Sequence, residues 1–449
     1  MNLYFSLLKL KARLLHGRQL SRADIHRHMA MKRRARLPGV CMVGVTGSGG
    51  KSTTSALVFH LLSAEYPVAL SLLENTEQMI APRLARFPRQ ARYGVFEISG
   101  HAPGVIDSVC ELVKPDVAII TVIASDHRSN FRDPGATARE KVRLALQAAQ
   151  RGGLVLLNAD DPQVLAMREQ LAQAQVRTFG EAQDADYRAL DVRHSPDGRL
   201  QFRCRVADEE ASFDVALLGK HLLVSALAAI ACAHQAGIPL ARLADRARLF
   251  EGLPGRCSVQ FNPGAPTFIC DTIKAPFSTL GLSFAQLDLF DQVPRKTIVL
   301  GKLSDYSGAE GSKYRQAYRM ARQHAERVII LGRSALTLNP QEGDVADHNL
   351  LLVDNVQALR QLIAETALPG EVILLKGSSK VDRLERIALA YQHPVTCWIS
   401  GCTREHTCFH CDLLTEDRRL LRPPVEGTSN MIEDPQHFSA LIAREGART

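Results

Sequence analysis

The sequence predicts an α/β fold with two domains and a cysteine-rich tail: a larger parallel-sheet domain with a nucleotide-binding loop, then a smaller Rossmann-like domain. Short apolar runs such as CMVGVT (41–46) and DVAIITVI (116–123) alternate with helical patterns, as in a parallel sheet covered on both faces. A second alternating series follows the linker-like GLPGR (252–256). Four cysteines within 15 residues come after that series, in a stretch without regular periodicity.

These changes of pattern divide the 449 residues into four parts, which is compatible with two or three domains. We predict a basic arm over residues 1–39, the larger domain over 40–252, the smaller domain over 253–395 and the tail over 396–449. Strands are expected near 41–46, 67–73, 93–98, 116–123 and 153–158 in the larger domain, and near 267–271, 296–301, 327–332, 350–354 and 371–377 in the smaller one.

The net charge of +8 is concentrated in the arm. Residues 1–40 contain ten Lys or Arg and one acid, a net of +9, so the remainder carries about −1. The excess belongs to one segment, and we therefore expect no nucleic-acid partner. Leucines between residues 3 and 15 recur at helical spacing among basic residues, which indicates an amphipathic helix on a membrane or a protein partner. The interpretation that we favour is a helix docked on its own domain with a solvated basic face.

The expected location is the cytoplasm. No apolar run approaches the ~20 residues needed to cross a bilayer, and the N-terminus lacks the small-residue cleavage site of a secretory signal. Six of the ten cysteines are scattered, as reduced cytosolic thiols are.

The stretch VGVTGSGGKSTT (43–54) predicts a strand, a phosphate-binding turn and a helix. Its glycines allow the backbone to approach a ligand, and the start of the helix offers unpaired N–H groups to an anion. Lys51 can reach the outer phosphates, and Ser52 or Thr53 can offer a hydroxyl to Mg²⁺. The strict P-loop pattern wants glycine at position 45, which is valine, so this is a shortened variant. The predicted nucleotide-binding residues here are Thr46, Gly47, Ser48, Gly49, Gly50, Lys51, Ser52 and Thr53.

Further motifs follow in order: FEISGH (96–101), SDH (125–127) and TAREKVRLAL (137–146). With the loop form T-G-[ST]-x-G-K-[ST], they make the chain resemble the Mur ligase family of ATP-dependent amide ligases, over residues of about 40 to 390. The resemblance implies Mg²⁺ ligands at Glu97, next to Ser99 and His101, and at His127. It also implies that Lys141 is carbamylated and holds a second Mg²⁺, since carbamylation turns a cation into an anionic oxygen ligand.

The family commonly has G-x-H-N-x-x-N before the next helix, and its second Asn contacts adenine. Here the stretch is GKHLLVSA (219–226), where Gly219 and His221 remain but Leu222 and Ser225 replace the two asparagines. We therefore expect adenine to be recognised by other groups.

The smaller domain has its own matches to the family. Arg256 in PGRCS corresponds to a phosphate-contacting arginine, and the planar fork of arginine suits that role. The resemblance places Asp271 at the nucleotide ribose and Lys376 and Ser378 at the cleft. Lys274 stands where the family has histidine, which adds a positive charge that could pair with a phosphate or an acidic substrate. Asp305 lies in the expected active-site loop.

The resemblance implies an ATP-dependent ligase that joins a carboxylate to an amine through an acyl phosphate and releases ADP and phosphate. Only about 40 residues precede the first strand, so the chain is most similar to members without the N-terminal UDP-binding domain, such as folylpolyglutamate and poly-γ-glutamate synthetases. We expect small-molecule or peptide carboxylate and amine substrates. The alternatives are an NTPase or phosphoryl-transfer enzyme without an amide product, and a non-catalytic nucleotide-binding module.

The tail sequence CWISGCTREHTCFHC has cysteines at 397, 402, 408 and 411, with spacing C-x4-C-x5-C-x2-C. Four thiolates in a compact loop suit tetrahedral zinc, and we predict a structural zinc ion on Cys397, Cys402, Cys408 and Cys411. The alternatives are free or redox-active thiols and, less favoured by the spacing, an iron–sulfur cluster.

Overall fold

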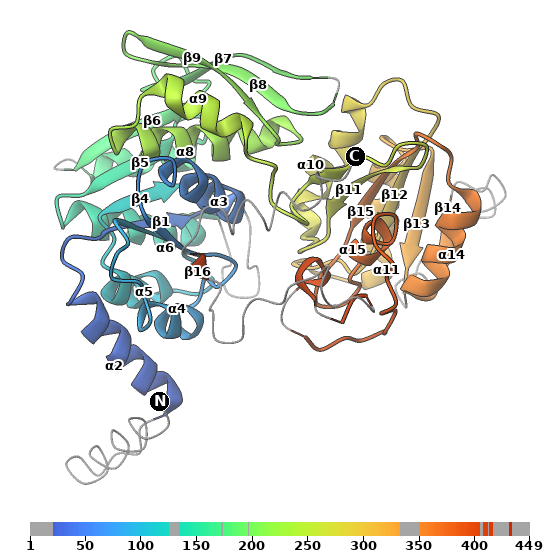
Figure 1. Ribbon diagram of the computed structural model, residues 1–449, viewed down its shortest axis with the longest axis horizontal. Coiled ribbons are helices and arrows are strands. Elements are labelled where there is room, and N and C mark those ends of the chain that lie inside the picture. Colours follow the sequence, from blue (N-terminus) through green and yellow to red (C-terminus); the bar gives the residue numbers. More distant parts are fainter. Residues whose placement is uncertain are drawn as a thin grey trace.

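The computed structural model describes residues 21–124, 134–171, 174–195, 197–332, 350–404, 407–411, 413–415 and 431–432. Two α/β units lie side by side, each built around its own sheet (Figure 1). Within these residues, no helix is long and apolar enough to cross a membrane.

The first sheet has ten strands in the order β16-β2-β3-β1-β4-β5-β6-β7-β8-β9. Strands β2 to β7 pair in parallel, whereas β7, β8 and β9 form an antiparallel meander at one edge. Their apolar runs are continuous because both faces of the parallel part are covered by helices. The strands are β1 Cys41–Thr46, β2 Val68–Ser71, β3 Tyr93–Glu97, β4 Val117–Ile120, β5 Leu154–Asn158, β6 Gln175–Gly180, β7 Tyr187–His194, β8 Leu200–Val206, β9 Glu209–Val215 and β16 Met431–Ile432.

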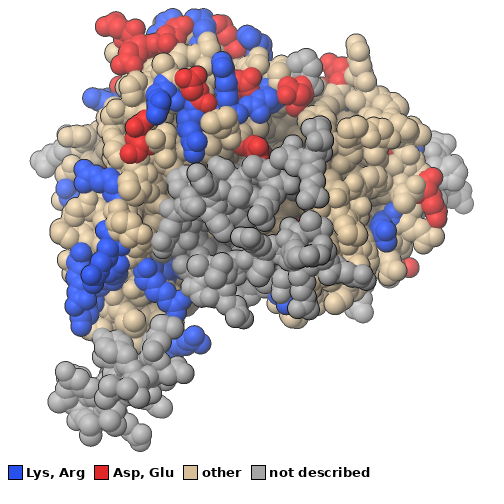
Figure 2. Space-filling model, in the orientation of Figure 1, with Lys and Arg blue, Asp and Glu red and all other residues tan. Residues whose placement is uncertain are grey.

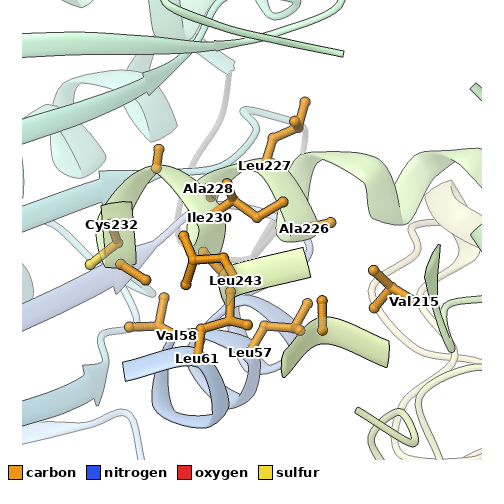
Figure 3. Close-up of a cluster of buried hydrophobic side chains, with 14 of the residues drawn as sticks. Leu57, Val58, Leu61, Val215, Ala226, Leu227, Ala228, Ile230, Cys232 and Leu243 are labelled. Carbon is orange, nitrogen blue, oxygen red and sulfur yellow. The ribbon is translucent and has the colours of Figure 1, made fainter. Parts of the chain in front are cut away.

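Helices cover both faces of this sheet, and each side has its own apolar core. One core joins α3, α8 and α9, whose side chains Leu57, Ile230 and Leu243 meet in Figure 3. The other lies under α2, α4, α5 and α6. The helices are α2 Arg22–Arg34, α3 Lys51–Leu62, α4 Glu77–Leu84, α5 Val105–Val113, α6 Pro134–Ala149, α7 Pro162–Leu165, α8 Leu223–Gln235 and α9 Leu240–Arg248, with short 3-10 turns η1 Ala166–Gln170 and η2 Lys220–Leu222.

The second sheet has six strands in the order β10-β11-β15-β12-β13-β14. Only β10 runs antiparallel, and the remaining pairs are parallel. The strands are β10 Ser258–Gln260, β11 Thr267–Asp271, β12 Lys296–Leu300, β13 Arg327–Leu331, β14 Leu350–Val353 and β15 Val372–Lys376. The helical elements are η3 Phe277–Thr279, α10 Leu280–Phe284, η4 Ala285–Leu289, α11 Glu310–Ala321, α14 Val356–Thr366 and α15 Glu385–Leu389.

The predicted fold class is confirmed, and the expected strands of both series form. The first helix after the loop begins at Lys51. The three boundaries between the four parts of our domain division stay predictions.

The two ends of the described chain meet the larger unit. Helix α2 docks on α4 and α5, and Arg27 pairs with Glu77 at 2.5 Å and with Glu111. The basic helix expected from the leucines between residues 3 and 15 lies outside the described residues and stays a prediction. After the cysteine-rich loop, which includes η5 Cys408–His410, β16 returns to the first sheet and pairs antiparallel with β2 through Met431 and Ser71.

Candidate active site

The glycine turn after β1 is shaped by close contacts with neighbouring backbone and hydroxyl groups. A Cβ on Gly47 would lie 1.9 Å from the Oγ1 of Thr121, so only glycine fits at this position. Gly50 caps α3 in the left-handed conformation, with φ of 76°. The turn therefore presents its backbone N–H groups and the start of α3 at the carboxyl edge of the sheet, where open α/β folds bind ligands.

Several predicted ligand groups of the turn lie together. The Nζ of Lys51 donates to the carbonyl of Gly47 at 2.6 Å, so the lysine lies over the turn. The hydroxyls of Thr46 and Thr54 are buried without a hydrogen-bond partner among the described residues. Ser48 donates to the carbonyl of Ala124, which ties the turn to the segment after β4. Glycines that a Cβ would clash with and unpartnered buried hydroxyls fit a bound phosphate chain.

Glu97 lies at the end of β3, beside the start of α3. Its Oε2 accepts a hydrogen bond of 2.9 Å from the Oγ of Ser52, so the two predicted Mg²⁺ ligands are adjacent. Its Oε1 accepts 2.8 Å from the Nδ2 of Asn75, and Glu97 is only 2% exposed. A buried carboxylate with a hydroxyl beside it is an oxygen-rich site that suits Mg²⁺.

Asn75 is a site residue that the sequence analysis missed. It lies in the loop between β2 and α4, and its carbonyl also accepts from the backbone N–H of Ser99. Asn75 therefore fixes both Glu97 and the loop after β3. Its sequence neighbourhood, LLENTEQ (72–78), has no periodicity or motif that would have singled it out.

Lys141 is buried in α6, with 1% of its surface exposed. The polar residues next to it in sequence are exposed or hydrogen-bonded to other groups. Arg139 is exposed, Glu140 accepts from the N–H groups of Gly104 and Ile106 at 2.8 Å, and Arg143 pairs with Asp107. This burial distinguishes Lys141 from its neighbours, and its carbamylation stays a prediction. The segment with Ser125 and His127 lies outside the described residues, so the predicted ligand His127 has no position here.

Arg256 reaches the turn from the other side of the linker. Its Nη2 lies 3.5 Å from the Oγ of Ser52, and its Nε is buried without a partner among the described residues. The residue after it, Cys257, is held in the left-handed region with φ of 55°, which is unusual for a side chain of this kind. The linker thus delivers a guanidinium group to the predicted phosphate and Mg²⁺ positions.

Asp271 and Lys376 form a buried ion pair at the ends of β11 and β15. The Nζ of Lys376 lies 2.5 Å from the Oδ2 of Asp271, which also accepts 2.7 Å from Ser283. Burial alone would raise the pKa of Asp271, but the charge and hydrogen bond of Lys376 outweigh it and the net pKa lies below its ordinary value. This carboxylate oxygen is engaged inside the smaller domain, so the predicted ribose contact remains a prediction.

Lys274 does not add an uncompensated charge to the cleft. Its Nζ pairs with the Oδ2 of Asp305 at 2.7 Å, and Asp305 has a left-handed φ of 55° in the loop after β12. Sequence reasoning identified both residues but not their pairing. The N–H of Ser378 donates to the partly buried Asp382.

The stretch 219–226, in which Leu222 and Ser225 replace the two asparagines of the family, lies where the two domains meet. Ser225 donates to the carbonyl of Gly50 at 3.3 Å, so it contacts the phosphate-binding turn itself. Burial lowers the pKa of His221, which keeps the imidazole neutral near pH 7. Across the seam, Gln286 donates to the Sγ of Cys257, and its Oε1 is buried without a partner among the described residues. Gln286 is a second group that sequence reasoning missed.

The cysteine-rich loop docks on the smaller domain through buried arginines. The Nη1 of Arg386 donates to the carbonyls of Cys397 and Ile399, each at 3.1 Å, and Arg383 donates to the carbonyl of Cys402. The Nη1 of Arg383 lies 4.0 Å from the Sγ of Cys408. The described residues contain no group of three or more His, Cys, Asp or Glu side chains placed to hold a metal ion, and all four thiols are free. The zinc site therefore stays a prediction.

A sequence model of the Mur ligase middle domain matches residues 45–233, the span that contains the turn, Glu97 and Lys141. The chain contains a Mur ligase middle domain, and its curated homologues are Mur ligases.

Two curated relatives of this Mur ligase show the extent of the similarity. The UDP-N-acetylmuramoyl-L-alanyl-D-glutamate–2,6-diaminopimelate ligase of Thermosynechococcus vestitus is 29% identical over 76% of this chain and 72% of its own. The UDP-N-acetylmuramoyl-tripeptide–D-alanyl-D-alanine ligase of Bacillus subtilis is 25% identical over 78% of this chain and 75% of its own. The chain is accordingly an ATP-dependent amide ligase.

Solved structures share the fold. MurF ligase from Thermotoga maritima, determined in complex with ADP, has a TM-score of 0.69 at 18% identity and matches 83% of this chain and 84% of its own. A variant of L. casei FPGS has a TM-score of 0.60 at 16% identity, and 95% of that chain is matched by 84% of this one.

Proposed function

We propose that this Mur ligase joins a peptide-type carboxylate to an amine, and that the residues around Ser52 carry out the phosphoryl transfer. The single observation that supports this most directly is the contact chain Arg256–Ser52–Glu97, which brings a guanidinium from one domain to a hydroxyl and a carboxylate of the other. A phosphoryl-transfer site needs positive charge at the phosphate and groups that position the phosphate there. The contacts among Arg256, Ser52 and Glu97 supply both.

The proposed reaction has two steps. A substrate carboxylate oxygen attacks the γ-phosphorus of ATP, the bond to ADP breaks, and an acyl phosphate forms. The amine then attacks the acyl carbon, phosphate leaves with the C–O electron pair, and the amine loses a proton to give the amide. Lys51 and Arg256 stabilise the charge of the transferring phosphoryl group, and the smaller domain closes over the larger one to exclude water.

Mg²⁺ is the proposed metal. Ser52, Glu97 and His127 would hold one ion and a carbamylated Lys141 a second, and these ions would neutralise phosphate charge. The adjacent Ser52 and Glu97 oxygens and the burial of Lys141 support this assignment. Asp271 and Arg256 are proposed to contact the nucleotide across the linker.

The substrates are proposed by class. The relatives named above act on UDP-N-acetylmuramoyl peptides and on amino acids or D-alanyl-D-alanine, so muramyl peptides belong in the first substrate panel. The resemblance to members without the UDP-binding domain supports including carboxylates without a UDP carrier. We propose a cytoplasmic location, supported by the free thiols, and a contact of the basic arm 1–39 with a membrane or a protein.

ADP release tests the function when it is measured with and without pools of carboxylates and amines. We expect release that requires both pools and yields an amide, with Lys51→Ala at least ~100-fold slower because a phosphate-binding charge is lost. Lys313→Ala, an exchange on α11 outside the site, is the control. ADP release that ignores both pools would instead identify an NTPase, and tight nucleotide binding without turnover a non-catalytic module.

We also propose a structural zinc ion on the four tail cysteines, supported by their spacing and by the guanidinium groups of Arg383 and Arg404 beside Cys408 and Cys411. Metal analysis of the purified chain should give about one zinc per chain. The variant Cys408→Ser/Cys411→Ser should lose it. A folded wild-type chain without zinc would reject the site.

A further inference from the structure

The aromatic ring of Phe409 lies against the linker that precedes the smaller domain. Phe409 belongs to η5 in the cysteine-rich loop (397–411). A Cβ on Gly255 would lie 3.1 Å from the Cε2 of Phe409 and 3.0 Å from the Cδ1 of Ile273, so the backbone of Gly255 is held between these two side chains. Gly255 also has a left-handed φ of 74°, which favours glycine. The tail therefore contacts the residue next to Arg256.

The linker at Gly255 is a short hydrogen-bonded turn. The N–H of Gly255 donates to the Oγ of Ser258 at 3.0 Å, and the N–H of Arg256 donates to the carbonyl of Leu253 at 2.9 Å. The carbonyl of Gly255 accepts a hydrogen bond of 3.1 Å from the N–H of Thr272, which follows β11. These bonds fix the linker to the smaller domain, and the ring of Phe409 adds a contact from the tail.

Buried ionisable side chains hold the loop that carries Phe409. Arg383 donates to the carbonyl of Cys402 at 3.4 Å, and the Oε1 of Glu385 accepts 3.1 Å from the N–H of Cys408, the residue before Phe409. Arg383 is 2% exposed and Glu385 is fully buried, so both belong to the interior, whereas few Lys or Arg side chains are visible on the smaller domain at the right of Figure 2. A buried polar group that loses its partner is costly, and these bonds therefore keep the loop in place.

Arg256 lies where a small movement of the linker matters. Its Nη2 is 3.5 Å from the Oγ of Ser52, at the outer limit of a hydrogen bond, and its Nε is buried without a partner among the described residues. A shift of a fraction of an ångström decides whether the guanidinium reaches Ser52, and misplacement of a catalytic group lowers the rate steeply. The contacts that hold Gly255 therefore also set the reach of Arg256.

We propose that the cysteine-rich loop positions Arg256 for phosphoryl transfer through the packing of Phe409 on Gly255. Phe409 is a positioning residue, because it acts through the linker. The proposal rests on the proposed function of Arg256, and it gives the tail a role in the ligase that does not require a bound metal ion.

Hydrogen exchange of the full chain without substrates tests the packing. The amides of Gly255 and Arg256 should exchange about ten-fold faster in Phe409→Ala, because the loss of a partly buried phenyl ring weakens the contacts of the linker. Phe409→Leu keeps apolar bulk at this position and should lie between Phe409→Ala and the wild type. Ile399→Ala removes an exposed side chain from the same loop and is the matched control, with exchange as in the wild type.

The amide of Cys408 reports in the same experiment whether the loop stays docked, because it donates to Glu385. Unchanged exchange at Cys408 together with faster exchange at Gly255 assigns the effect to the ring of Phe409. If the whole loop is released in Phe409→Ala, the smaller change in Phe409→Leu decides the question.

A double-mutant cycle tests whether Phe409 acts through Arg256. Phe409→Ala should lower kcat for ADP formation by at least ~10-fold and leave the Kd of ATP nearly unchanged. In an Arg256→Ala background, the same exchange should change the rate by less than about two-fold, because no guanidinium remains to be positioned. Single-turnover measurements at high enzyme concentration detect the slow rates of that background.

Two results would overturn the proposal. One is wild-type exchange at Gly255 and Arg256 in Phe409→Ala. The other is an equal loss of rate from Phe409→Ala in both backgrounds, as general destabilisation would cause. A wild-type chain that forms no amide would reject the proposed function instead, and the exchange result would still show whether Phe409 holds the linker.

Discussion

The Nη2 of Arg256 lies 3.5 Å from the Oγ of Ser52, although 204 residues separate the two in sequence. One belongs to the linker before the smaller domain and the other to the first turn of α3 in the larger domain. Because Ser52 also donates to Glu97, one guanidinium group connects the position of the smaller domain to the predicted Mg²⁺ ligands.

Arg256→Lys should lower kcat by at least ~10-fold while nucleotide binding by the larger domain changes little. Lysine keeps the charge but loses the planar fork that can contact Ser52 and phosphate oxygens together. Steady-state kinetics of ADP release measure this, with Arg319→Lys on α11 as a control. A variant with wild-type kcat would remove Arg256 from the phosphoryl-transfer step.

Asn75→Ala should raise the Mg²⁺ concentration needed for half-maximal activity by about 10- to 100-fold, as loss of a ligand's hydrogen-bond partner commonly does. Without Asn75, the Oε1 of Glu97 loses the 2.8 Å contact that orients it. Activity is measured against Mg²⁺ at saturating ATP. Asn262→Ala, which removes a hydrogen bond in a turn of the smaller domain, should leave the Mg²⁺ curve in place. An equal shift in both variants would indicate general destabilisation instead.

Lys141→Ala should abolish the ligase activity, and small carboxylic acids added to the assay should restore part of it. The variant leaves a space in the buried site, and an added carboxylate can supply the oxygen ligand that the carbamate is predicted to provide. Activity is measured over a series of acetate concentrations, with chloride salt at equal ionic strength as the control. Full activity of Lys141→Ala without any addition would contradict the assignment.

Lys376→Met should destabilise the chain by about 3–5 kcal/mol, because it leaves the buried carboxylate of Asp271 without its partner. The double variant Asp271→Asn/Lys376→Met should recover much of this loss. Denaturant unfolding of the wild type and both variants measures the difference. A double variant no more stable than the single one would show that packing, not the unpaired charge, causes the loss.

The same pair predicts a pH dependence. The pKa of Asp271 is lower in the folded chain than its ordinary value of about 3.9, so its contribution to stability is complete above that value. The contribution is lost as the pH falls through the folded-state pKa. The difference in unfolding free energy between wild type and Asp271→Asn should therefore be constant near neutral pH and shrink in acid.

The sequence pattern predicted the strands and the glycine turn, because these features depend on residues that lie close together in the sequence. Buried parallel strands need continuous apolar runs, so β1 and β11 were visible as CMVGVT and TFICD. The glycine turn was visible because close backbone approach requires glycine at Gly47 and Gly50. Lys141 was selected only through the family resemblance, and its burial then distinguished it from Arg139 and Arg143.

Contacts between distant segments were not predictable in this way. Asn75, Gln286 and the Lys274–Asp305 pair depend on how loops from different elements meet, and no periodicity or spacing encodes such meetings. The hydrogen bond from Arg33 on α2 to the carbonyl of Phe87 likewise joins a helix to a turn some fifty residues later. The distribution of charge along the sequence identified the basic arm, but it did not indicate that the arginines of that turn lie beside it.

The pairing of β16 with β2 affects how the protein is made. Strand β2 would otherwise be the open edge of the ten-stranded sheet, and an open edge can pair with another chain. Residues 431–432 follow β2 by several hundred residues in sequence, so the larger domain can build its core during synthesis before its edge strand has been made. A premature stop before residue 431 would therefore release a chain whose nucleotide-binding sheet has an uncovered edge and a tendency to self-associate.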